Sequence, residues 1–338
     1  MTKNICLFGR HFLQIYLINK MNKLGFKKPL IILDKLKTYT RDKKLLTKYN
    51  LFADIESLAK RNKVKIIYLS NINSRKMLDL LKKNNINLGF SLGCRQIFKQ
   101  NIIRYFKGNL YNLHDSYLPY ERGGGLNSWR ILLNRKIVGN TIHKVERGID
   151  NGDIVLQRKI KILKKFPFPI DYDLAQQKNS VVLLDNFLMK LKNKKKFLLR
   201  KQNINKSEYF SRLYTKNNGA LDVDQKPEKF ERFVRAFSFP YEGAWILKEN
   251  KKIFIKNVKV IKQDIFSDKI FNGRVYRKYK DGRVLLIIGG GLIEVKEVFL
   301  KNKRYLANSF FKLNSVIRNS PKTLFLSRSN ITNISKFN

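Results

Sequence analysis

Residues 110–157 contain several side chains that could act as acids or bases or stabilise an oxyanion. Asn112 and His114 stand two residues apart on an extended segment that ends an apolar run, so both side chains are expected on the same side. An amide and an imidazole that point into one cleft can stabilise a developing oxyanion. Asp150 follows in a glycine-bounded turn, where its carboxylate could orient the imidazole and accept a proton directly or through water.

This trio contains no nucleophilic Ser or Cys, so it points to direct transfer of an acyl group between two bound substrates. Each residue alone has a structural explanation, because a single histidine after a strand is usually structural and a single aspartate between glycines is often a plain turn. The trio is interpreted as a site because of its neighbours, which are Pro119, Arg122, the Gly123–Gly125 run and Trp129.

The chain before this stretch alternates between strands and helices. Apolar runs predict strands, and amphipathic patterns predict helices; the strands are expected at 4–8, 29–33, 64–69, 88–92 and 110–113, and the helices up to 24, at 54–62 and at 74–84. This order predicts an α/β domain with a Rossmann-like parallel sheet and helices on both faces. Ligands bind such sheets beyond the carboxyl ends of the strands. The first turn lacks G-x-G-x-x-G, which argues against a nicotinamide dinucleotide.

The second half of the chain predicts a different architecture. Helices are expected at 172–192 and 227–237. The very basic segment 190–206 is interpreted as a solvated interdomain linker, and the alternative is a strip that contacts an anion. Five short strands with glycine punctuation then predict a small OB-like antiparallel β-barrel. The predicted domains are a catalytic domain at 1–200, the barrel at 201–305, and a Ser- and Asn-rich tail at 306–338 whose composition is typical of partial disorder.

Composition places few limits on function. The net charge is +46, but lysines are spread along the whole length among Asn and Ile, which favours compositional drift over a dedicated anionic partner. Cys6 and Cys94 sit in apolar runs and are expected to be buried, reduced thiols. The N-terminal segment does not match a signal peptide, and no apolar run is long enough to span a membrane, so a cytoplasmic protein is expected.

The central stretch resembles the signature of the folate-dependent formyltransferases. The matching residues are N-L-H-D-S-Y-L-P-Y-E-R-G-G-G, followed by G-I-D-N-G-D-I. The resemblance implies that Asn112, His114 and Asp150 are catalytic, that N10-formyltetrahydrofolate is the formyl donor, and that no metal takes part. The segment G-F-S-L-G-C-R-Q-I-F resembles the family's folate-pocket loop. It implies that the cofactor-binding residues are Gly89, Phe90, Ser91, Leu92, Gly93 and Ile97.

The acceptor amine is less well specified. Arg122 and the glycines Gly123, Gly124 and Gly125 are expected to bind the acceptor. The motifs E-Y-F-S-R-L, N-G-A-L-D and P-Y-E-G-A resemble the sugar-nucleotide formyltransferases of surface polysaccharide (lipopolysaccharide or O-antigen) synthesis, and this acceptor is preferred. Methionyl-tRNA is the alternative, and the basic charge would then bind tRNA. A non-enzymatic RNA-binding protein is the competing class, and a homodimer remains open.

Overall fold

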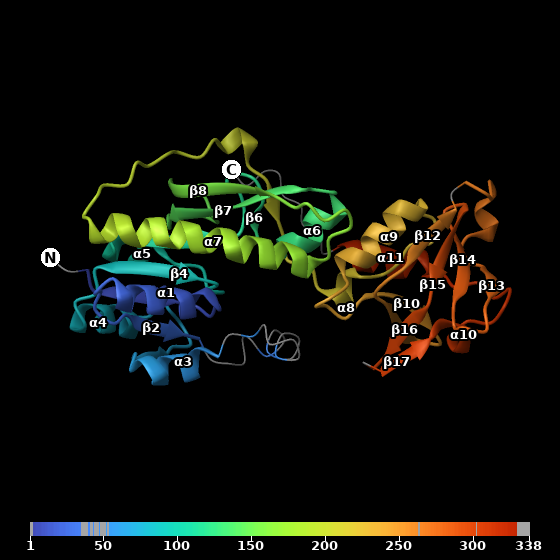
Figure 1. Cartoon of the computed structure of the whole chain (residues 1–338), viewed down its shortest axis with the longest axis horizontal. Coiled ribbons are helices and arrows are strands. Elements are labelled where there is room, and N and C mark those ends of the chain that lie inside the picture. The colour runs from blue at the N-terminus through green and yellow to red at the C-terminus, as the bar shows by residue number, and fades with distance from the viewer. Residues whose placement is uncertain are drawn as a thin grey trace.

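The computed structural model describes residues 3–34, 40, 43, 47, 52, 54–262, 264–301 and 303–329. Its N-terminal half is built on a seven-stranded sheet with the strand order β3-β2-β1-β4-β5-β7-β8 (Figure 1). These strands are β1 Ile5–Phe8, β2 Leu30–Leu33, β3 Ile66–Tyr68, β4 Leu88–Leu92, β5 Leu110–His114, β7 Ile137–Lys144 and β8 Ile154–Lys161. The first five are parallel, as predicted, but β7 and β8 run antiparallel at one edge.

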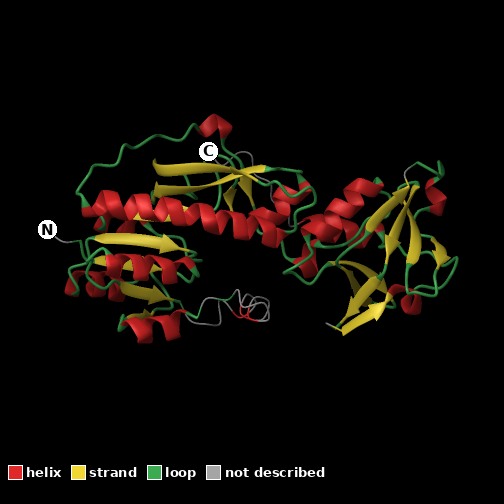
Figure 2. Cartoon of the chain, in the orientation of Figure 1, coloured by secondary structure: helices red, strands yellow, loops and turns green. Residues whose placement is uncertain are grey.

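Helices cover both faces of this sheet, as predicted (Figure 2). The described helices are α1 Leu13–Lys23, α3 Ile55–Asn62, α4 Arg75–Lys83, α5 Gln100–Tyr105, α6 Leu126–Leu132 and α7 Pro169–Lys192. Side chains alternate along β1, so Leu7 packs with α1, α3 and α7 while Phe8 packs with α4 and α5. The two helices that begin where the sequence predicts are capped by Asp54 and Ser74, whose side chains accept hydrogen bonds from backbone amides in the first turn.

The C-terminal half forms two four-stranded antiparallel sheets around one core, where the sequence predicted five strands. One sheet contains β10 Ala244–Lys248, β11 Lys251–Ile255, β16 Glu297–Leu300 and β17 Lys303–Leu306. The other contains β12 Lys259–Lys262, β13 Val275–Lys278, β14 Val284–Ile288 and β15 Gly291–Val295. Helices α8 Thr215–Asn218 and α9 Pro227–Ala236 precede the sheets.

Residues 307–329 belong to this C-terminal unit, although the sequence suggested a partly disordered tail. They form α10 Ala307–Phe310 and α11 Pro321–Ser329. Asn319 is buried, and its amide donates to the carbonyl oxygens of Leu221 and Trp245 at 2.9 and 3.2 Å. These bonds tie the segment to the rest of the unit. Positions 330–338 lie outside the described residues.

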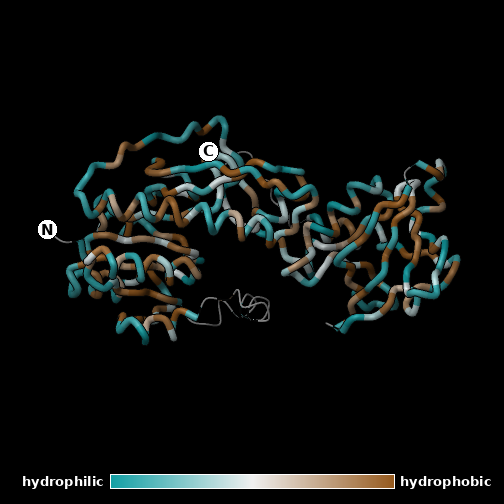
Figure 3. The backbone as a smooth tube through the Cα atoms, in the orientation of Figure 1, coloured by the Kyte–Doolittle hydropathy of each residue, from teal (hydrophilic) through white to brown (hydrophobic). Residues whose placement is uncertain are grey.

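Most of the apolar residues lie in the strands and on the inner helix faces, whereas the connection that follows α7 is mostly hydrophilic (Figure 3). Cys6 and Cys94 are free thiols, as predicted, and Cys6 is fully buried, whereas Cys94 is only partly buried and departs from the expected burial. Within the described ranges no helix has the length and apolar character needed to cross a membrane.

Candidate active site

The structure brings Asn112, His114 and Asp150 together at the carboxyl end of β5. Asn112 and His114 lie on this strand, and Asp150 lies in the loop between β7 and β8. The Nδ1 atom of His114 is 3.6 Å from Oδ2 of Asp150. The same Oδ2 accepts a hydrogen bond of 3.1 Å from the backbone amide of Gly123. The antiparallel β7–β8 hairpin therefore returns the carboxylate to the imidazole.

His143 on β7 completes this group, and the sequence reasoning assigned it no role. It is paired with Asn112 across the β5–β7 ladder. The Nδ2 atom of Asn112 lies 3.1 Å from Nε2 of His143, which in turn lies 3.5 Å from Oδ1 of Asp150. The carboxylate of Asp150 thus has one imidazole at each oxygen.

Main-chain carbonyl groups indicate which ring nitrogens carry protons. A carbonyl oxygen only accepts hydrogen bonds, so the ring nitrogen that contacts it must be the donor. Nε2 of His114 contacts the carbonyl oxygen of Glu121 at 2.9 Å, and Nδ1 of His143 contacts that of Lys144 at 2.7 Å. The other ring nitrogens, Nδ1 of His114 and Nε2 of His143, face Asp150 and are left to accept a proton.

The environment keeps Asp150 ionised. Burial alone would raise the pKa of this carboxyl group, but its interactions with the side chains of His114 and His143 and with the Gly123 amide outweigh burial and hold the pKa well below its usual range. Asp150 also has a left-handed backbone conformation, with φ of 50°. Such a conformation is uncommon outside glycine, and Asp and Asn tolerate it best.

The connection between the two halves helps to hold this loop. The Nε2 atom of Gln202 donates to the carbonyl oxygens of Asp150 and Gly152 at 2.9 and 2.7 Å. Arg200 forms a β-bridge with Ile154, the first residue of β8. The basic 190–206 segment is therefore more than the solvated linker that the sequence suggested, because its C-terminal part packs against the loop that carries Asp150.

A cavity of about 730 Å³ opens beside the trio and His143. Of the predicted folate-binding residues, Ser91, Leu92, Gly93 and Ile97 line it, but Gly89 and Phe90 do not. Phe90 is buried in the core and packs against Phe187. A Cβ on Gly89 would lie 2.5 Å from the Leu110 side chain, so close packing explains this glycine. These two positions face the packed core and not the cavity, and their role in folate binding stays a prediction.

The glycine run also lines the cavity, whereas Arg122 does not. Arg122 is buried and donates to Gln202 at 2.8 Å, and burial lowers the pKa of its guanidinium. The structure therefore does not support Arg122 as an acceptor ligand. Gly123 has φ of 96°, and a Cβ there would lie 2.3 Å from the carbonyl oxygen of Phe210. Only glycine fits this close approach of β6 (Arg122–Gly123) to β9 (Tyr209–Phe210).

Asp173 on α7 is a further carboxyl group in the cavity wall, and the sequence reasoning missed it. Asn127 donates to its Oδ1 at 2.5 Å. Burial raises the pKa of Asp173 to about 7, and the negative charge of Asp115 adds to this effect. Asp173 can therefore change its protonation near neutral pH. Among the described residues, no group of three or more His, Cys, Asp or Glu side chains could hold a metal ion.

Comparisons with known proteins agree with this architecture. The bifunctional polymyxin resistance protein ArnA of Wigglesworthia glossinidia brevipalpis is 28% identical over 256 residues, which are 76% of this chain but only 38% of that protein. The methionyl-tRNA formyltransferase of Finegoldia magna is 26% identical over 72% of this chain and 76% of its own length.

Two solved structures share the fold over 90% of this chain at 21% sequence identity. An N-formyltransferase from Helicobacter canadensis, in complex with folinic acid and dTDP-3-aminofucose, matches over its full length (100%) with a TM-score of 0.63. The sugar 3N-formyl transferase WlaRD, crystallised with dTDP and 5-N-formyl-THF, matches over 99% of its length with a TM-score of 0.62. Two family models, formyl transferase at residues 19–167 and the formyl transferase C-terminal domain at residues 214–314, together match most of the sequence, and the chain belongs to the formyl transferase family.

Proposed function

We propose that this protein transfers a formyl group from N10-formyltetrahydrofolate to the primary amine of an amino sugar in a sugar nucleotide. The observation that carries the proposal is the grouping of Asn112, His114 and Asp150 at one cavity. The cavity volume of about 730 Å³ lies in the range of small-molecule sites. The donor supplies an activated formyl carbon, and the acceptor supplies the attacking nitrogen.

The residues of this chain divide the work of the transfer. The amine nitrogen bonds to the formyl carbon, the bond from that carbon to N10 of the donor breaks, and the proton that the amine loses is balanced by the proton that N10 gains. Asn112 has two amide hydrogens, of which one points to His143, so the other is left to stabilise the oxyanion. His114 and Asp150 accept the proton from the amine, directly or through water.

A sugar nucleotide also needs cationic groups for its diphosphate. Arg95 and Arg212 line the cavity, and Arg212 lies next to Gly124 and Gly125. A guanidinium binds phosphate oxygens by paired hydrogen bonds. We infer that these two arginines, rather than Arg122, contact the diphosphate. The formylated sugar would then serve the synthesis of a surface polysaccharide.

Methionyl-tRNA is the second candidate acceptor. The observation in its favour is the 26% identity to the methionyl-tRNA formyltransferase of Finegoldia magna over most of both chains. The net charge of +46 is compatible with a tRNA partner. Both candidates present a primary amine, so the same three catalytic residues would serve either.

The test is to incubate the protein with N10-formyltetrahydrofolate and either dTDP-3-aminofucose or charged initiator tRNA, and to measure the mass of the product. We expect a gain of one formyl group on a sugar nucleotide. Formylation of the tRNA alone would transfer the proposal to the second candidate. Absence of product with both acceptors, and with other amino-sugar nucleotides, would refute it.

A further inference from the structure

We propose that Glu121 and Arg130 are positioning residues that hold the His114 imidazole with its proton on Nε2, so that Nδ1 is the atom that accepts a proton in the reaction. The tautomer follows from contacts within the protein, whereas the role of Nδ1 in proton transfer rests on the proposed function. The contact that starts the argument is the 2.9 Å hydrogen bond from Nε2 of His114 to the main-chain oxygen of Glu121.

Without this carbonyl group the opposite tautomer would be favoured. Nδ1 of His114 faces Oδ2 of Asp150 at 3.6 Å, and a neutral imidazole beside a carboxylate prefers to donate to it. A proton on Nδ1 would leave no lone pair there for the amine's proton. The Glu121 carbonyl therefore competes with Asp150 for the single proton of the neutral ring. The tautomer depends on how firmly that carbonyl is held.

The backbone of Glu121 has a conformation that this residue type disfavours, so other contacts must hold it. Its φ is 58°, a left-handed conformation that is unfavourable for a residue with a Cβ. Arg130 supplies the compensation, because its Nε and Nη2 atoms both donate to Oε2 of Glu121, at 2.8 and 2.7 Å. Arg135 donates to Oε1 at 3.2 Å. Arg130 and Glu121 are both buried, so this ion pair is shielded from solvent.

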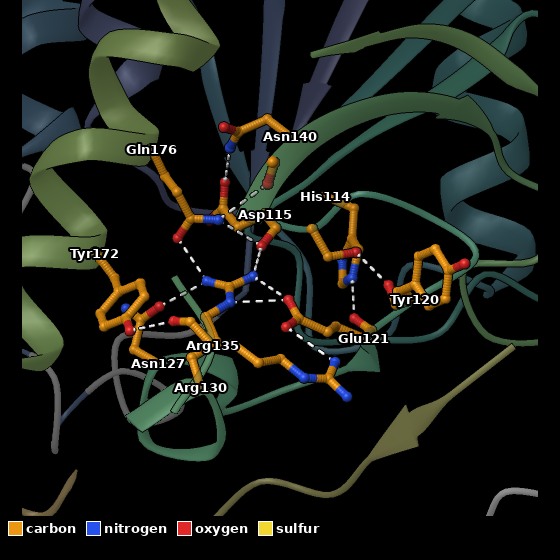
Figure 4. A network of polar contacts seen from close by, with 12 residues as sticks. His114, Asp115, Tyr120, Glu121, Asn127, Arg130, Arg135, Asn140, Tyr172 and Gln176 are labelled. Atoms are coloured by element: carbon orange, nitrogen blue, oxygen red, sulfur yellow. Dashed lines mark hydrogen bonds and ion pairs between the residues drawn. The ribbon is translucent and has the colours of Figure 1, made fainter. Parts of the chain in front are cut away.

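Arg130 also holds the chain on the other side of His114 (Figure 4). Its Nη2 donates to the main-chain oxygen of Asp115, the residue that follows His114. Its Nη1 donates to Asn127 and to Gln176, at 2.7 Å each. All five hydrogens of the guanidinium thus have acceptors within the protein. Arg130 therefore has no hydrogen left for a substrate, and its role is to fix the groups around the imidazole.

The charged and titratable groups around His114 come from four elements. Asp150 faces Nδ1, and the His143 ring lies edge-on with its centroid 6.3 Å away. Asp115 adjoins His114 in the chain. Glu121 and Arg130 neutralise one another on the Nε2 side. The net effect places one ionised carboxylate at Nδ1 and a neutral acceptor at Nε2. A proton taken from the amine then converts the ring to an imidazolium paired with Asp150.

The test uses the full chain with ¹⁵N-labelled histidine, and reads the His114 tautomer from nitrogen chemical shifts at a pH where the ring is neutral. We expect the wild type to carry the proton on Nε2. In Arg130→Met the proton should move wholly or partly to Nδ1, and kcat should fall about 10²-fold while KM changes little. Arg130→Lys should recover part of both effects. Arg158→Met, an exposed arginine on β8, is the matched control and should change neither.

Arg130→Met leaves Glu121 buried without its main partner and can fail to fold. The double variant Glu121→Gly/Arg130→Met removes both charges, and glycine suits the left-handed backbone, so it is the second test. Folded protein with an unchanged His114 tautomer, or with unchanged kcat, would overturn the inference. The tautomer is read without substrate. A shifted tautomer with no formyl transfer to any acceptor in the wild type would instead refute the proposed function and leave the positioning role standing.

Discussion

Replacement of Asp150 by asparagine tests the most specific claim about the site, which is that one negative charge between two imidazoles is needed for transfer. Asparagine has the same shape and tolerates the left-handed backbone, with φ of 50°, so the loop should keep its conformation. The side-chain oxygen can still accept from the Gly123 amide. The change therefore removes the charge and little else.

The size of the effect follows from the distance. Two unit charges at 3.6 Å attract by roughly 4–5 kcal/mol at an effective dielectric constant of about 20. Part of this attraction is offset by the cost of burying both groups. A loss of about 3–4 kcal/mol in the transition state corresponds to a kcat/KM reduced roughly 10²–10³-fold.

The assay is formyl transfer from N10-formyltetrahydrofolate, with kcat and KM measured separately. Asp153→Asn is the matched control, because it removes the same charge from the same loop at a residue that does not line the cavity. We expect the control to retain nearly full activity. An Asp150→Asn enzyme within threefold of the wild type would refute the claim that this carboxylate manages the proton.

Three further predictions concern stability. Gly123→Ala should lower the free energy of unfolding by roughly 1–3 kcal/mol and reduce activity, because its Cβ meets the Phe210 oxygen. Gly124→Ala should be tolerated, because the nearest neighbour of its Cβ is 3.6 Å away, and thermal unfolding distinguishes the two variants. Asp173 has a raised pKa of about 7, so its contribution to the stability of the folded state is lost as pH rises from about 4 to 7. Asp173→Asn should abolish this decline, and the measurement is the free energy of unfolding at pH 5 and pH 8. Asn319→Ala should cost about 2–3 kcal/mol in denaturant unfolding, because it leaves the Leu221 carbonyl and the Leu247 amide without these partners and removes one of the two donors to the Trp245 carbonyl.

Local sequence signals were enough to predict most of the N-terminal elements. Strand β4 has the predicted bounds of 88–92, and the helix starts near Asp54 and Ser74 follow from side chains that cap their first turns. Strand direction could not be predicted from the same signals. An apolar run has the same period in a parallel and an antiparallel pair, so the reversal at β7 and β8 left no trace in the pattern.

That reversal explains why His143 escaped prediction. His143 reaches Asn112 through the antiparallel register of β5 and β7, and nothing in the spacing of the two residues along the chain encodes it. Arg122 illustrates the converse case, and its role as an acceptor ligand stays a prediction. Its place in a recognisable motif indicated a ligand, but burial and the bond to Gln202 are tertiary facts. Composition identified the cavity's region, while the pairing of distant segments decided which side chains face it.

The connection between the two halves shows most clearly how the pairing of distant segments shapes the site. Gln202 holds the backbone of the Asp150 loop, and β9 pairs with the strand that contains Gly123. Both loops that bear on the site are therefore fixed by residues 202–210, which a domain boundary at 200 would assign to the other half. The position of the Asp150 carboxylate thus depends on residues that follow the sheet in the sequence. The same segment therefore contacts both the loop of Asp150 and the glycine run, and the Gly123 amide donates directly to the Asp150 carboxylate beside the cavity.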